Sequence, residues 1–356
     1  MDCGGDCASI AAMPDMLQPH SGPGWLRKLA AGFLVTVVLL GASPAKAALQ
    51  IRISHVVAEE TPKGLAINRF KELVEQRSAG QIRVVVYPAA QLYGDHDEIE
   101  ALRLGAVDML APSLSKFGRI GFPEFELFDL PFLFDSVQSV RRITQGPIGQ
   151  RLLERLSRQG MTGLGYLDNG FKQMSANRPL RDPADFKGLR MRVQPSRVIA
   201  AQFTALGARP IRLNFSETRQ ALASGVVDGT ENPISNFWTQ RMHEVQSDLT
   251  LTNHGYLGYA VVTNQRFWRS LSPQEKLLLE RALGEALDYG NQIADIQNDK
   301  ATAALREAGS TRIHTLTSAQ RTALRQSVQP AYDELAQRIG NAWLEEFQSA
   351  GVRSPK

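Results

Sequence analysis

Two segments that lie 120 residues apart have similar sequences, and this internal repeat restricts the possible folds more than any other feature. Glu100–Phe117 and Gln220–Phe237 are identical at seven of eighteen positions. Both contain Gly-x-Val-Asp, a pattern typical of a helix end followed by the start of a strand. The repeat predicts two related α/β lobes that present the carboxyl ends of these strands to a shared cleft, where open α/β sheets bind ligands. The alternative is a chance similarity between two helix–turn–strand units.

Strand and helix signals alternate along the chain, as in α/β layers. The first expected elements are a strand at 49–54, a helix that begins at Pro62 after the N-cap Thr61 and stops at Gly80, a strand at Ile82–Tyr87, a helix at Asp95–Leu104 and a strand at Val107–Ala111. Residues 117–134 contain six of the fifteen phenylalanines, which we interpret as core packing rather than a membrane contact.

A second set of elements begins near Met161. Strands are expected near 161–167, 189–193 and 208–212, and helices near 196–206, 216–224 and 318–347. Ser272 opens a capping box with Glu275, and the next plausible stop is Gly309. The helix between them would be about 54 Å long at 1.5 Å per residue, long enough to brace two lobes.

Residues 1–47 have the features of a secretory signal peptide. A positive pair, Arg27-Lys28, precedes an apolar run of about a dozen residues and a small-x-small site that ends at Ala47. Cleavage near Ala47 would export the protein to the periplasm, whereas a retained membrane anchor is the alternative. The region before Arg27 is unusually long, so Met13 or Met16 is a candidate for the true start.

Composition and motifs argue against several classes of function, including nucleic-acid binding and thiol chemistry. The length of 356 residues suggests two domains, and the net charge of +4 comes with no basic stripe of the kind that binds nucleic acid. Cleavage near Ala47 would remove both cysteines, Cys3 and Cys7, and with them any disulfide or thiol chemistry. No nucleophile elbow, phosphate loop or paired-histidine metal motif occurs. We therefore expect no cofactor and a binding protein rather than an enzyme.

Arg192 is the candidate ligand-binding residue that the local pattern favours. In Gly188–Val193, Leu189, Met191 and Val193 point inward, and Arg190 and Arg192 lie on the other face. Arg190 is interpreted as a solvated residue. Arg192 lies where the strand leads into a helix start, a place where a guanidinium can hold a carboxylate through two hydrogen bonds.

Six segments of the chain form an ordered set of characteristic blocks: Ser54–Gly64, Tyr87–Asp95, Asn169–Asn177, Phe186–Gln194, Val227–Pro233 and Thr252–Tyr259. In this order, they resemble the solute-binding subunit of TRAP (tripartite ATP-independent periplasmic) transporters, most closely its C4-dicarboxylate branch. The resemblance covers nearly the whole mature chain. It implies an α/β fold of two lobes with crossing strands and a long helix spanning both. It also implies a membrane permease of one small and one large subunit as the partner, and a monomeric binding protein.

The resemblance also implies a set of binding residues. The anchor arginine of the family falls on Arg192, and its second cationic contact falls on Lys172, where a lysine lacks the bidentate geometry of arginine. The pocket asparagine falls on Asn232 and the pocket aromatic residue on Phe215. Further pocket-lining candidates are His55, Ser113, Lys116 and His254. For the two histidines, a neutral core role is the competing interpretation.

These expectations define one main hypothesis and its rivals. The mature protein would capture succinate, fumarate or malate between lobe I, residues 48–169 plus 258–297, and lobe II, residues 170–257 plus 298–356. Arg192 would hold one carboxylate, and Lys172 with Lys116 and His55 would hold the other. The alternatives are a 2-oxo, aromatic or sugar acid as the ligand, a periplasmic enzyme, or a receptor that presents its ligand to a sensor.

Overall fold

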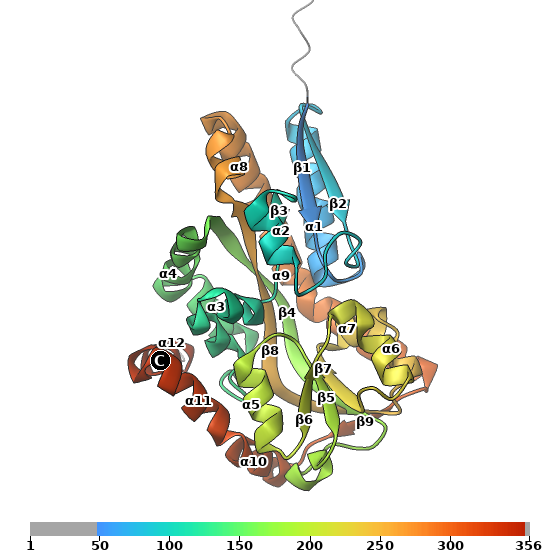
Figure 1. The fold of residues 1–356 in the computed structure, drawn as a ribbon. Coiled ribbons are helices and arrows are strands. Elements are labelled where there is room, and N and C mark those ends of the chain that lie inside the picture. The colour runs from blue at the N-terminus through green and yellow to red at the C-terminus, as the bar shows by residue number, and fades with distance from the viewer. Residues whose placement is uncertain (1–47, 353–356) are drawn as a thin grey trace, which may run out of the picture. The chain divides into compact units, whose positions relative to one another are not determined.

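Two long neighbouring strands, β4 (Met161–Ala176) and β8 (Asp248–Asn264), form the axis of the fold (Figure 1). They pair antiparallel along their length, with register shifts near Gly163, Asp168 and Lys172. The computed structural model describes residues 48–352. The predicted signal peptide and its cleavage site therefore lie outside the described residues.

The described strands belong to one sheet in the order β2-β1-β3-β8-β4-β7-β5-β6, and β9 also pairs with β8. The shorter strands are β1 (Leu49–Ser54), β2 (Ile82–Tyr87), β3 (Met109–Leu110), β5 (Arg190–Val193), β6 (Arg209–Arg212), β7 (Gly229–Asn232) and β9 (Arg312–Thr315). Strands β1–β3 pair in parallel and join β8 near its end, at Val262 and Thr263. Strands β5–β7 also pair in parallel and join β4 at residues 173–176. We call β1–β3 the first half-sheet and β5–β7 the second half-sheet.

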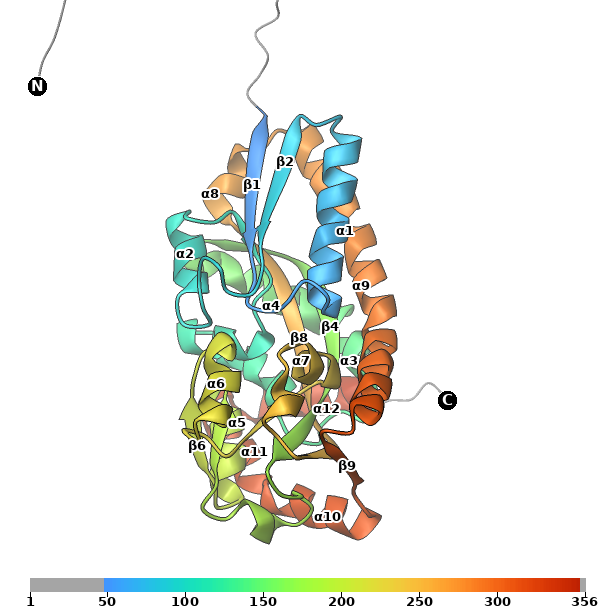
Figure 2. The same ribbon diagram turned by 90° about the vertical axis from the view of Figure 1, so that its right-hand side faces the viewer.

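Helices pack around both half-sheets (Figures 1 and 2). They are α1 (Pro62–Arg77), α2 (Glu98–Leu104), α3 (Val137–Thr144), α4 (Pro147–Arg155), α5 (Arg197–Ala205), α6 (Thr218–Ala223), α7 (Ile234–Thr239), α8 (Gln265–Ser270), α9 (Pro273–Ala308), α10 (Ser318–Ser327), α11 (Gln329–Ile339) and α12 (Asn341–Val352). Within residues 48–352, none of these helices has both the length and the apolar character that a membrane crossing requires.

The expected long helix is confirmed as α9, which has 36 residues and the predicted capping box of Ser272 with Glu275. It packs against α1, β4 and α7, and thus against elements next to both half-sheets (Figure 2). Gly290 permits its close approach to α1, because an added Cβ would lie 2.5 Å from Leu167 Cδ1 and 2.7 Å from Ala66 Cβ. The helix therefore braces the two ends of the sheet, as its length predicted.

The two repeated segments have the same local structure. Each contains a short helix that ends at a left-handed glycine and continues into a strand, α2 into β3 and α6 into β7. In the first half-sheet, the backbone N–H and guanidinium of Arg52 donate to Asp108 at 2.8–3.0 Å. In the second, Arg190 makes the same contacts with Asp228 at 2.7–3.0 Å. The equivalence favours two related units over a chance similarity.

The phenylalanine-rich segment packs in the core, as expected. It forms two 3-10 helices, η1 (Leu114–Ile120) and η2 (Pro123–Asp129), and Phe117, Phe125 and Phe128 are no more than 1 % exposed. Phe117 stacks on Phe125 with 4.7 Å between ring centroids. This packing places η1 against the carboxyl end of β3.

Several element boundaries differ from the expectations. Helix α2 begins at Glu98 rather than Asp95, and the Asp95 carboxylate contacts Phe215 and Lys116 instead of capping the helix. Strand β4 continues nine residues beyond Leu167, and β8 was not predicted as a strand. Both strands mix polar and apolar residues without regular alternation. The C-terminal helical stretch is divided into α10, α11 and α12.

The predicted lobe boundaries, at residues 169/170, 257/258 and 297/298, fall within β4, β8 and α9. These elements continue through the boundaries without a break. The assignment of each segment to lobe I or lobe II thus stays a prediction.

Candidate functional site

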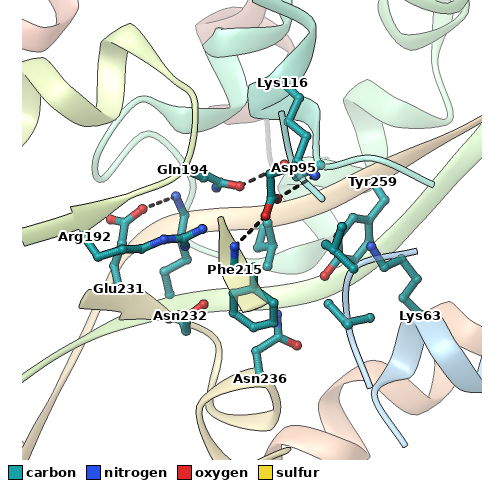
Figure 3. A pocket seen from close by; sticks show the side chains of 15 residues that line it. Lys63, Asp95, Lys116, Arg192, Gln194, Phe215, Glu231, Asn232, Asn236 and Tyr259 are labelled. Atoms are coloured by element: carbon teal, nitrogen blue, oxygen red, sulfur yellow. Dashed lines mark hydrogen bonds and ion pairs between the residues drawn. The ribbon is translucent and has the colours of Figure 1, made fainter. Parts of the chain in front are cut away.

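A small pocket lies at the carboxyl ends of strands from both half-sheets, beside the middle of β4 and β8 (Figure 3). Six of the predicted binding residues line it: Ser113, Lys116, Lys172, Arg192, Phe215 and Asn232. Polar lining residues that were not predicted are Lys63, Asp95, Gln194, Glu231, Asn236 and Tyr259. His55 and His254 do not line the pocket. The repeat prediction of a shared cleft at strand ends thus matches the position of this pocket.

Arg192, in β5, is only 4 % exposed. Its Nε and Nη2 atoms donate to the carbonyl oxygen of Leu213 at 3.1 and 2.9 Å, and its Cζ lies 5.7 Å from the ring centroid of Phe215. Among the described residues, no carboxylate lies within 4.0 Å of its guanidinium. Burial lowers the pKa of Arg192, and the more distant Asp95 and Glu231 oppose that effect. A buried guanidinium with free donor positions is suited to binding an anion.

Lys172, in β4, already has carboxylate partners. Its Nζ lies 2.7 Å from Glu231 Oε1 and 3.8 Å from Asp129 Oδ1. Burial alone would raise the pKa of Glu231, but Lys172 and His254 lower it to about 2. Burial raises the pKa of Asp129 to about 6, against the opposing effect of Lys172. The charge of Lys172 is therefore largely balanced by the protein itself.

Lys116, in η1, is balanced in the same way. It pairs with Asp95 at 2.7 Å and also with Glu98. Burial disfavours the charged lysine, but the two carboxylates outweigh that effect and raise its pKa. The other Asp95 oxygen accepts a hydrogen bond from the backbone N–H of Phe215 at 2.5 Å. Asp95 thus connects the loop after β2 to the end of β6.

Polar side chains complete the wall of the pocket. Ser113 Oγ donates to Gln194 Oε1 at 2.8 Å, which joins the ends of β3 and β5. Asn232, at the end of β7, and Asn236, in α7, present amide groups next to Phe215 (Figure 3). Asn236 occupies the position in the second repeat that Lys116 occupies in the first. Residues from both half-sheets therefore meet around one space.

Lys63, in the first turn of α1, is fully buried on the side of the pocket away from Arg192 in Figure 3. Its Nζ donates to the carbonyl oxygen of Ala111 at 3.0 Å and lies 3.9 Å from the ring centroid of Tyr259. Burial and the charge of Lys116 lower the pKa of Lys63 to about 7, although Glu98 and Asp95 oppose them. A carboxylate placed beside Lys63 would favour its charged form.

The two candidate histidines are core residues. His254 is 1 % exposed, and its ring nitrogens contact Thr252 Oγ1 and Glu231 Oε2 at 2.7 Å each. It therefore orients Glu231 from behind the pocket wall. His55 is also 1 % exposed, and burial together with the charge of Lys63 lowers its pKa to about 3. Both positions agree with the competing interpretation of neutral core histidines.

The burial of His55 predicts a loss of stability in acid. The unfolded chain takes up a proton at this histidine below pH 6.5, whereas the folded protein does so only near pH 3. The contribution of neutral His55 to the free energy of unfolding is therefore complete above pH 6.5. It falls by about 1.4 kcal/mol per pH unit between pH 6.5 and about pH 3. Chemical denaturation measures the free energy of unfolding at each pH from 8 to 4. This free energy should fall less steeply with decreasing pH for His55→Gln than for the wild type. Parallel curves would contradict this prediction.

Three charged pocket residues that were not predicted share one feature of the sequence. Lys63, Asp95 and Glu231 all lie inside the sequence blocks that carry the family resemblance, but none had a local pattern that marked it for burial. Lys63 follows a helix N-cap, where a lysine is usually exposed. Only their contacts with Tyr259, Lys116 and Lys172, which are distant in sequence, show that they belong to the pocket.

Comparisons with known proteins identify the family that the chain resembles. Residues 53–338 match the family model described as bacterial extracellular solute-binding protein, family 7, also called DctP. The C4-dicarboxylate-binding periplasmic protein DctP of Rhodobacter capsulatus is 52% identical over 82% of this chain and 87% of its own length. A TRAP periplasmic solute-binding protein from Shewanella oneidensis, solved with bound succinate, is 43% identical, with a TM-score of 0.84 over 86% of this chain and 100% of that one.

A more distant relative binds a different acid. The sugar acid binding protein DctPAm of Advenella mimigardefordensis, solved with galactonate, is 30% identical, with a TM-score of 0.82 over 85% of this chain and 97% of that one. Proteins that share this fold are thus solved with acids of more than one class, succinate in one and galactonate in another. The chain belongs to the DctP family of TRAP transporter solute-binding proteins.

Proposed function

We propose that this protein captures a C4 dicarboxylate of the succinate, fumarate or malate type outside the cytoplasm and delivers it to a TRAP permease in the membrane. The observation that carries the proposal is the buried guanidinium of Arg192, which has donors free for an anion and, among residues 48–352, no carboxylate at ion-pair distance. Family membership supports a transport role rather than catalysis.

In this proposal Arg192 holds one carboxylate through its guanidinium. Asn232 orients the ligand with its amide group, and the ring of Phe215 packs against the carbon chain. A carboxylate bound to a buried guanidinium makes charge-assisted hydrogen bonds, which are about twice as strong as neutral ones. The same carboxylate removes the cost of burying an unpaired charge, several kcal/mol for an isolated ion.

The ligand is also proposed to close the cleft. Ser113 contacts Gln194, and Asp95 contacts Phe215, so direct bonds join groups from the two ends of the sheet at the pocket. Opening would separate these pairs and expose Arg192 to water, where its charge needs no partner. Binding of the carboxylate therefore shifts the population toward the closed form by a hinge motion. The closed form is the one we propose to dock on the permease.

A thermal-shift screen of residues 48–356 tests the ligand class. Succinate, fumarate, malate, 2-oxoglutarate, pyruvate, galactonate and benzoate would each be added at about 1 mM. A ligand with a micromolar dissociation constant stabilises the folded state by about 4 kcal/mol, a shift of several degrees. We expect shifts with the C4 diacids. If the melting temperature shifts only with galactonate or another acid, the dicarboxylate assignment is wrong. Such a result would still agree with a transport role.

A further inference from the structure

The pocket contains four cationic side chains, which differ in their partners. Lys116 pairs with Asp95 and Glu98, and Lys172 pairs with Glu231 and Asp129. Within the described part of the chain, Arg192 and Lys63 have no carboxylate at ion-pair distance. Both are buried, and Figure 3 shows them on opposite sides of the pocket. The protein thus leaves two separated cationic groups for ligand charge.

The surroundings of Lys63 favour an anion beside it. One of its three donor positions is used by the carbonyl oxygen of Ala111, which leaves donors for a further acceptor. Its position in the first turn of the 16-residue helix α1 adds the positive end of the helix dipole. Tyr259 holds the ammonium group over its ring at 3.9 Å and thereby restricts where the amine can lie. Lys63 is therefore a preformed contact rather than a mobile surface charge.

We propose that Lys63 binds the second carboxylate of the ligand and makes the pocket selective for diacids over monoacids. The inference rests on the proposed function, because it assigns the far end of the same dicarboxylate. It differs from the expectation that Lys172 holds this carboxylate. Lys172 would first have to give up Glu231, whose other oxygen is already bound to His254.

Binding at Lys63 should also involve a proton. The charged and titratable groups around Lys63 are Lys116, Glu98 and Asp95, His55 from the end of β1, and the ring of Tyr259 from β8. Because burial lowers the pKa of Lys63 to about 7, part of the protein carries a neutral amine near that pH. A bound carboxylate raises the pKa of this amine, so binding takes up a proton and affinity for the diacid falls as the pH rises from 7 to 9.

Matched lysine-to-methionine variants test the assignment. Lys63→Met and Lys172→Met each remove one buried charge and keep a chain of similar length. Isothermal titration calorimetry would measure succinate and its monoamide, succinamate, which keeps the shape but lacks the second charge. For Lys63→Met we expect the affinity for succinate to fall at least tenfold and the affinity for succinamate to change less than threefold. For Lys172→Met we expect the two ligands to be weakened alike.

A pH series provides a second readout that needs no monoamide. Wild-type affinity for succinate should fall several-fold between pH 7 and pH 9, and Lys63→Arg, which stays charged, should remove that dependence while retaining binding. If Lys63→Met loses affinity for both ligands equally, or if Lys172→Met instead loses affinity selectively for the diacid, the assignment of Lys63 is wrong. The proposed function would not be affected by either result. If no C4 diacid binds the wild type, the proposed function fails and the inference fails with it.

Discussion

Replacement of Arg192 with methionine should weaken binding of the C4 dicarboxylate roughly 30-fold or more, about 2–5 kcal/mol, the range found when a buried charge loses its partner. Arg192 is buried, lines the pocket and has more donors than Leu213 uses, so the variant leaves the ligand carboxylate desolvated without a cationic partner. Isothermal titration calorimetry with the C4 diacid found in the screen measures the effect. The melting temperature without ligand should stay the same or rise, because a buried unpaired charge has been removed.

Arg190→Met is the matched control for this experiment. Arg190 lies two residues earlier in β5, but its side chain is 43% exposed and pairs with Asp228 at 2.7 Å. We expect its affinity to stay within threefold of the wild type, since the pair lies outside the pocket. An Arg192→Met protein that binds as well as Arg190→Met would refute the anchor role.

Glu231→Ala is expected to destabilise the folded protein by about 3–5 kcal/mol, because it leaves the buried ammonium of Lys172 without its nearest partner. Asp129, at 3.8 Å, is too far from Lys172 Nζ to replace the lost hydrogen bond. His254 loses its acceptor at the same time. Urea denaturation at pH 7.5 measures the free energy of unfolding, and the loss would be a large part of the total for an ordinary domain.

Two further variants show whether the pair itself is responsible. In Glu231→Met combined with Lys172→Met, both charges are absent, and much of the lost stability should return. Glu72→Ala removes a carboxylate that is 66% exposed and pairs with Arg69 at 3.2 Å, so it should cost less than about 1 kcal/mol. A Glu231→Ala protein no less stable than Glu72→Ala would show that the buried pair contributes nothing.

Local sequence patterns predicted the elements that depend on neighbouring residues. The alternation of Leu49, Ile51 and Ile53 identified β1, and the N-cap Thr61 with Pro62 identified the start of α1. The capping box of Ser272 predicted where α9 begins, and Gly309 predicted where it ends. In each case the signal and the structure lie within a few residues of each other.

The parts that were missed depend on contacts distant in sequence. Strand β8 has no regular alternation, because nearly all of its residues are buried, on both faces of the strand. In the pocket, the position of Arg192 followed from its strand and the family resemblance. The pairing of Lys172 with Glu231 and of Lys116 with Asp95 depends on the tertiary fold, and so does the burial of Lys63. Sequence reasoning therefore found the cations of the pocket more readily than it found their partners.

The two long strands have a consequence for the order in which the chain can fold. One edge of the first half-sheet, β3, stays unpaired until residues 262–263 of β8 pair with it, about 150 residues after β3 in the sequence. The second half-sheet needs β4, and β4 is itself held by β8 and α9. Neither half can therefore finish folding while the chain is still short, and early intermediates leave strand edges unpaired. The protein should thus depend on being kept unfolded until nearly the whole chain is available, and should then fold slowly as a single unit.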